Sequence, residues 1–196
     1  LLSAEAVRDL RPARTPIIDP QVLSTVTANP PRDLLAARDS LPPQVLRLLV
    51  PPLRTCALFL VKKNVAVGWD VKSADDAVTT ARIRDVLLPL SAASGLSEAG
   101  NVRRASLGNP RDPTTMERTL FRFLRTAPPR AFAALPVLAG DDVIAVLYVD
   151  RDGPLDDGLI DEVRRAGAAL GDALAPLAAA GALFPARSLP PVQLSR

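Results

Sequence analysis

The sequence predicts an α+β domain with a central antiparallel sheet of five to six strands and flanking helices. Apolar runs at 56–69 and 131–150 are each split by a short turn, which is typical of a β-hairpin. The stretch 157–180 then carries apolar residues at helical spacing. Strands joined by short turns pair antiparallel, and the helices that follow them cover the sheet.

The chain divides into three parts. Residues 1–40 carry five prolines and show little hydrophobic periodicity, so we expect an N-terminal extension or linker with short helical pieces. The domain itself is predicted over 41–180. Residues 181–196 predict a disordered tail.

The first half of the domain predicts a helix, a hairpin and a third strand. A helix is expected from Leu41, and Pro51 and Pro52 should end it because proline lacks the N–H that a helix needs. The hairpin turns at Asn64 and has a mostly buried first strand. The third strand is expected around 86–90.

The middle segment has fewer apolar residues. It predicts a short helix near 94–99 and a weak strand near 102–107. A stronger helix is predicted over 112–126, because Thr114 and Glu117 match the spacing of a capping box.

The second hairpin turns at Gly140 and leads into the final helix, 157–180. Gly167 and Gly171 lie four residues apart in that helix. Each glycine costs about 1 kcal/mol relative to alanine in a helix. We therefore expect both to permit close packing against the sheet or a partner helix.

Composition excludes several classes of site. The chain has no histidine and a single cysteine, Cys56, which lies in an apolar run and predicts a buried structural thiol. Histidine-ligated metal, haem and histidine-dependent catalytic triads are therefore excluded. The acidic residues form no general acid–base pair and no calcium loop. We expect no metal, no cofactor and no enzymatic activity.

Charge is unevenly distributed, although the net charge is only +3. Seven arginines fall within 100–130, whereas nine acidic residues fall within 131–181, which predicts a basic and an acidic face. Arginine binds phosphate and carboxylate in bidentate geometry. The basic face is thus a candidate site for an anionic ligand or an acidic partner surface; the alternative is a solvated helix face. Its residues are Arg103, Arg104, Arg118 and Arg122.

The segment 135–174, "LPVLAGDDVIAVLYVDRDGPLDDGLIDEVRRAGAALGDAL", resembles the C-terminal half of a GAF domain. Pro136, Gly140 and the run Ala145–Asp150 occupy the places of the family's strand proline, turn glycine and following strand, with Ala145 where glycine is usual. The segment "CALFLVKKNVAVGWD" (56–70) resembles the family's first hairpin. The resemblance covers about 41–180.

The resemblance implies a fold that binds a small molecule between the sheet and the middle segment, or that serves in dimerisation and signalling. Trp69 and Tyr148, the only tryptophan and tyrosine, are candidates to line such a pocket; the alternative is that they belong to the core. The Asn-Lys-Phe signature of cyclic-nucleotide-binding members is absent. No cysteine or histidine lies where a bilin would attach.

We therefore predict a non-enzymatic, GAF-like regulatory domain of a larger cytoplasmic signalling protein of bacterial type. It would act by binding a small molecule, by forming a homodimer, or by both, with other domains or a signalling protein as partners. The alternative is an interaction scaffold, either with a vestigial pocket or as a roadblock-like adaptor. A membrane span is not predicted, because no apolar run approaches about 18 residues. Nucleic-acid binding is not favoured, because no helix-turn-helix or aromatic stacking platform is present.

Overall fold

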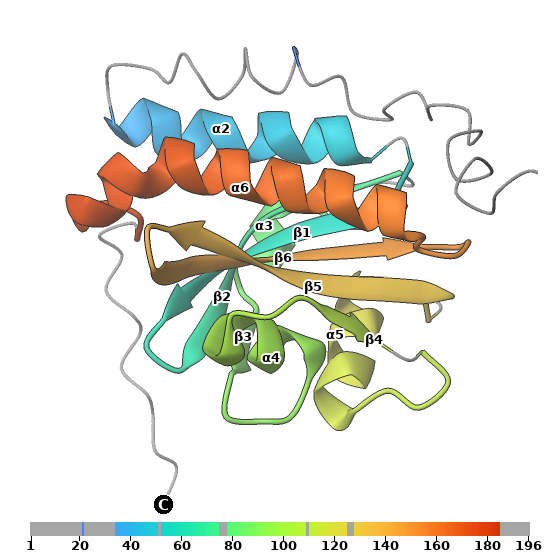
Figure 1. Ribbon diagram of the computed structural model, residues 1–196. Coiled ribbons are helices and arrows are strands. Elements are labelled where there is room, and N and C mark those ends of the chain that lie inside the picture. The colour runs from blue at the N-terminus through green and yellow to red at the C-terminus, as the bar shows by residue number, and fades with distance from the viewer. Residues whose placement is uncertain are drawn as a thin grey trace, which may run out of the picture.

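The computed structural model describes residues 34–50, 52–74, 78–108, 110–124 and 128–184, together with Gln21. A six-stranded antiparallel sheet lies at the centre (Figure 1). Its strands are β1 (Thr55–Lys62), β2 (Val65–Ser73), β3 (Leu87–Pro89), β4 (Ser106–Gly108), β5 (Ala131–Ala139) and β6 (Asp142–Arg151). Their order is β3-β2-β1-β6-β5-β4, and all neighbours are antiparallel. The predicted α+β class with an antiparallel sheet of five to six strands is confirmed.

The ends of the chain are described only in part. The predicted extension over 1–40 is described continuously from Leu34, and the predicted tail over 181–196 is described to Phe184. Apart from Gln21, the rest of both predictions lies outside the described residues.

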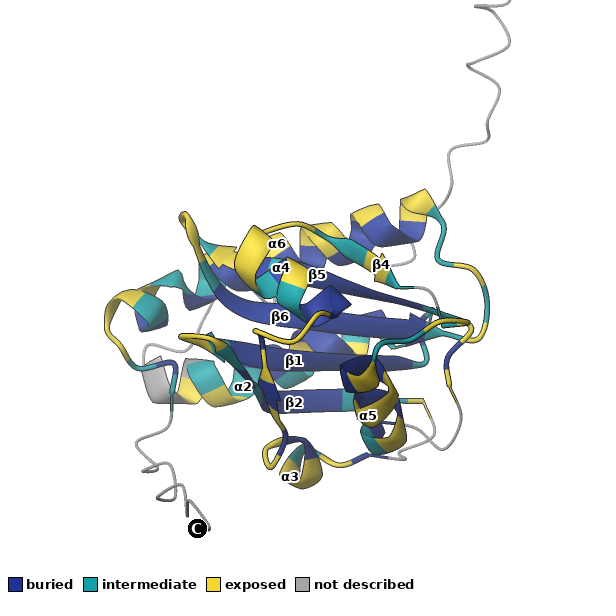
Figure 2. Ribbon diagram, turned by 90° about the horizontal axis from the view of Figure 1, so that it is seen from below, coloured by how far each residue is buried: buried dark blue, intermediate teal, exposed yellow. Residues whose placement is uncertain are grey.

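Helices flank both faces of the sheet. The long helices α2 (Leu34–Leu49) and α6 (Asp157–Ala179) lie side by side over one face (Figure 1). The other face carries α4 (Gly95–Val102) and α5 (Thr115–Leu124) (Figure 2). Together with the edge strand β4, these helices belong to residues 91–108 and 110–124, termed the insert. The short helix α3 (Thr80–Ile83) flanks β2. The weak strand predicted near 102–107 is β4. It lies further toward the C-terminus than predicted, because α4 extends to Val102.

The first helix starts earlier than predicted. It begins at Leu34 rather than Leu41, and Pro42 and Pro43 lie inside it. Each proline lacks the N–H that would bond four residues back, which costs about 3 kcal/mol in an isolated helix. The apolar face of α2 offsets this cost by packing on α6 and the sheet. The predicted end before the proline pair is confirmed, since the helix stops at Leu49.

Both predicted hairpins are confirmed. β1 and β2 are joined by a two-residue turn in which Lys63 has a φ of 54°. β5 and β6 are joined at Gly140, whose φ of 59° is a conformation that glycine adopts without strain. Pro136 is tolerated inside β5 because β4 pairs only with 132–134, which leaves a free edge beside the proline.

The two glycines of α6 differ in their surroundings. A Cβ added at Gly171 would lie 2.0 Å from the carbonyl oxygen of Leu138 in β5, so only glycine permits this approach. A Cβ added at Gly167 would meet its nearest atom, a methyl of Val137, at 3.9 Å, which is ordinary contact. The prediction of close packing against the sheet is confirmed at Gly171. At Gly167 the contact with the sheet leaves room for a Cβ, and packing of Gly167 against a partner helix stays a prediction.

Apolar side chains fill both sides of the sheet. On the helix side, β1, β5 and β6 contribute residues that pack under α2 and α6. On the insert side, the ring of Phe132 contacts Phe121 edge to face at 4.9 Å between centroids and stacks with Tyr148 at 6.2 Å. Within the described residues, no helix combines the length and the apolar character that crossing a bilayer requires.

Candidate functional site

Trp69 and Tyr148 lie on opposite faces of the sheet. Trp69 sits beside a bulge in the β1–β2 ladder, is 5% exposed and belongs to the cluster under α2 and α6. Tyr148 lies on β6, faces the insert and is fully buried. The two side chains cannot line a common pocket, and each belongs to the core.

Tyr148 is part of a small polar group in an otherwise apolar layer. Its hydroxyl lies 3.1 Å from a carboxylate oxygen of Asp150, which is itself fully buried. Thr55 pairs with Asp150 across the β1–β6 ladder, and its buried hydroxyl has no hydrogen-bond partner among the described residues. The Asp150 carboxylate needs a donor such as the Tyr148 hydroxyl at this depth, because burial of a charge without hydrogen bonds is costly.

The four predicted arginines are exposed. Arg103 ends α4 in a left-handed conformation with a φ of 58°, and Arg104 follows it. On α5, the guanidinium of Arg118 donates to the hydroxyl of Thr115 at 3.3 Å. None of the four lines either of the two surface grooves described below.

Glu117 ties the insert together. One carboxylate oxygen accepts the Thr114 N–H at 2.8 Å, while the Glu117 N–H donates to the Thr114 hydroxyl at 3.2 Å. This confirms the predicted capping box. The other oxygen accepts the Gly95 N–H at 2.9 Å, in the first turn of α4. The sequence contained no signal for this link between the two helices.

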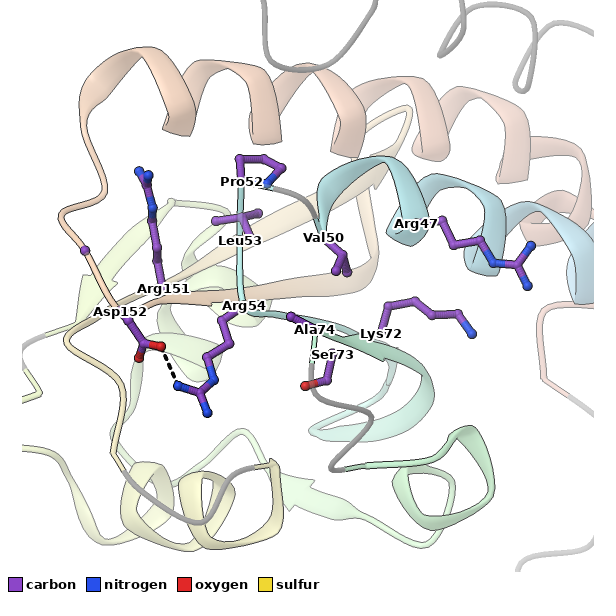
Figure 3. A pocket seen from close by; sticks show the side chains of 11 residues that line it. Arg47, Val50, Pro52, Leu53, Arg54, Lys72, Ser73, Ala74, Arg151 and Asp152 are labelled. Carbon is purple, nitrogen blue, oxygen red and sulfur yellow. Dashed lines mark hydrogen bonds and ion pairs between the residues drawn. The ribbon is translucent and has the colours of Figure 1, made fainter.

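A surface groove of about 890 Å³ opens at one end of the sheet (Figure 3). Its walls are the end of α2, the segment 52–54 that leads into β1, the segment 72–74 that ends β2, and the segment 151–153 that ends β6. The ladders bring these segments together, because Thr55 pairs with Ser73 on one side and with Asp150 on the other.

Four of the residues that line this groove are cations. They come from distant parts of the sequence and are Arg47, Arg54, Lys72 and Arg151. Asp152 is the one acidic residue in the described part of the lining, and it forms an ion pair with Arg54. Sequence reasoning missed this site, because the strand register brings Arg54, Lys72 and Arg151 together and the packing of α2 on the sheet adds Arg47.

A second groove of about 700 Å³ adjoins the first and shares Asp152 and Gly153 with it. Its lining adds two further arginines, Arg111 and Arg130, and three prolines. The two grooves therefore form a continuous basic surface around the segment that follows β6.

Cys56 is fully buried. Burial raises the pKa of its thiol well above the ordinary value, and the negative charge of Asp150 adds to the effect. The thiol is therefore kept protonated and inert, as predicted for a structural cysteine. Among the described residues, no three side chains of the metal-binding types are grouped to hold an ion.

No protein-family model matches the sequence, and no curated protein gives a significant match. Solved structures do match. The GAF domain of a phosphoenolpyruvate-protein phosphotransferase from Coxiella burnetii is 15% identical, with a TM-score of 0.65 over 83% of this chain and 96% of that one. The chain has a GAF fold. The GAF domain of the corresponding Acinetobacter protein is also 15% identical, with a TM-score of 0.60 over 82% of this chain and 95% of that one.

The GAF fold is also matched by residues 122 to 287 of a methyl-accepting chemotaxis protein. That segment is 14% identical, with a TM-score of 0.61 over 83% of this chain and 99% of that one. Identities this low establish the GAF fold alone, so the ligand and the output of this domain must be argued from its own residues.

Proposed function

We propose that this chain is a non-catalytic GAF-type regulatory domain that acts through its surface. The observation that carries the proposal is the filled layer between sheet and insert. Phe59, Phe132 and Tyr148 are the largest fully buried side chains, and all three lie in that layer. A GAF domain whose interior is occupied by its own rings has little room for an enclosed ligand.

The polar groups of the interior support the same proposal. Glu117 is engaged by backbone N–H groups of α4 and α5, and Asp150 by the hydroxyl of Tyr148. These carboxylates thus act in folding rather than as a general acid and base. The matched GAF domains of a phosphotransferase and a chemotaxis protein further favour a regulatory role in a larger signalling protein.

A thermal-shift screen tests whether the interior is filled. We expect nucleotides, tetrapyrroles and small aromatics such as indole to leave the melting temperature of the wild-type chain unchanged. Phe132→Ala should lower the free energy of unfolding by about 3–5 kcal/mol and leave an apolar cavity. Indole should bind in this cavity and raise the melting temperature of the variant. Phe121→Ala provides a second, more peripheral cavity in case the first variant fails to fold. Stabilisation of the wild-type chain by any of these molecules, by about 2 °C or more, contradicts the proposal.

The homodimer stays a prediction. Sedimentation velocity of the full chain over a range of concentrations tests it, and a species of twice the monomer mass is expected to accumulate as concentration rises. A strict monomer at the highest concentration means that the regulatory role depends on a different partner.

A further inference from the structure

The groove at the end of the sheet has a mixed lining of charged and apolar groups. In Figure 3, Arg47 and Lys72 extend toward one side of it, and the paired side chains of Arg54 and Asp152 lie on the other. Val50 and Leu53 lie between these two sides. The groove thus offers cations at both ends and an apolar centre. With the adjoining groove that holds Arg111 and Arg130, it is termed the cationic groove.

Much of this positive charge is unneutralised. Among the described residues, Arg47, Lys72 and Arg130 have no ion pair with a carboxylate. The guanidinium of Arg151 donates to the carbonyl oxygen of Pro154 at 3.3 Å, which positions it without neutralising it. Of the described residues, Asp152 is the only carboxylate that lines either groove. Like charges held together repel one another, so an anionic group that enters the groove is attracted.

We propose that the cationic groove is a docking site for an acidic polypeptide segment that also carries apolar residues. Carboxylates of the segment would bind Arg47, Lys72 and Arg151, and its apolar side chains would cover the half-buried Val50 and Pro52. The proposal rests on the proposed function, since it names the surface and the partner through which the domain acts.

The shape and lining favour a polypeptide over other anions. The cations are spread over two adjoining open grooves, whereas a small ligand is usually enclosed in one concave pocket. No aromatic side chain is found among the described residues that line the two grooves, so these residues offer a base no surface on which to stack. The apolar floor and the prolines around it instead suit a chain that alternates acidic and apolar side chains.

A random peptide library displayed on phage, selected on the immobilised full chain, provides the probe. We expect the recovered peptides to be enriched in aspartate and glutamate with interspersed apolar residues. Their affinity, measured by fluorescence anisotropy, should fall as salt is raised. Recovery of no peptide, or of peptides without acidic enrichment, overturns the proposal.

Charge reversal locates the site. The double variant Arg47→Glu with Lys72→Glu is expected to weaken peptide binding about tenfold or more. The matched control, Arg118→Glu with Arg122→Glu, makes the same change in net charge on α5 and should change affinity by less than about twofold. Asp152→Asn removes the competing carboxylate and should tighten binding about twofold. All five side chains are exposed or half-buried, so the variants should fold, which their melting curves will verify.

Three further outcomes overturn the proposal. They are equal weakening by the two double variants, tighter binding of a poly-dT oligonucleotide than of any recovered peptide, and displacement of the peptide by inorganic phosphate at an equal concentration of negative charge. Failure of the proposed function is distinguishable from these outcomes. Stabilisation by an enclosed small molecule would refute the filled interior and leave peptide binding at the groove unaffected.

Discussion

Gly171→Ala is expected to destabilise the domain by about 3 kcal/mol. The new Cβ would lie 2.0 Å from the carbonyl oxygen and 3.0 Å from the carbonyl carbon of Leu138. Leu138 belongs to β5, whose ladder to β6 shifts register between Val137 and Leu138. Because this backbone is fixed by its pairing, α6 must move away from the sheet, and the contacts of its buried face are lost. Urea denaturation followed by circular dichroism measures the change.

Gly167→Ala is the matched control. It lies one helical turn earlier on the same helix, and its added methyl meets nothing closer than 3.9 Å. Alanine is favoured over glycine in a helix by about 1 kcal/mol, so this variant should be as stable as the wild type or more stable. If both variants lose similar stability, the loss does not arise from the approach of α6 to Leu138, and the packing argument is wrong.

Local patterns were enough to predict most of the sheet. The two hairpins, the strand at 86–90 and the final helix each depend on residues adjacent in sequence, and turn residues such as Gly140 specify their own conformation. The start of α2 could not be predicted in this way. Pro42 and Pro43 are local signals against a helix, and the packing of α2 on α6, more than a hundred residues away, outweighs them.

The candidate site was harder to predict than the fold. Clustering of arginines in the sequence indicates Arg103, Arg104, Arg118 and Arg122, but residues that are neighbours in sequence need not form one site in space. The cationic groove instead combines Arg47, Lys72 and Arg151, which are far apart along the chain and isolated in local charge patterns. The pairing of β1 with both β2 and β6 brings Lys72 and Arg151 together, and the packing of α2 on the sheet adds Arg47. Neither long-range contact is encoded in a local pattern.

Glu117→Ala is expected to destabilise the domain by about 3 kcal/mol and to loosen the insert more than the sheet. The substitution removes the acceptor of two backbone N–H groups, those of Thr114 and Gly95, at a position where the side chain is 5% exposed. The Gly95 N–H then has no protein acceptor at the start of α4. Hydrogen exchange should therefore accelerate at α4 and α5 while β1 and β6 remain protected, and denaturation gives the global loss.

One further variant separates the charge of Glu117 from its volume, and a second serves as a control for the loss of a carboxylate. Glu117→Gln keeps the volume but has a single side-chain oxygen, so it can satisfy Gly95 or Thr114 fully but not both, and about half of the loss should remain. Glu98→Ala removes an exposed carboxylate from α4 and should cost less than about 0.5 kcal/mol. Uniform acceleration of exchange across sheet and insert in Glu117→Ala would show that the insert does not open by itself. The carboxylate would then support the whole domain, since α4 and α5 would unfold only together with the strands that they cover.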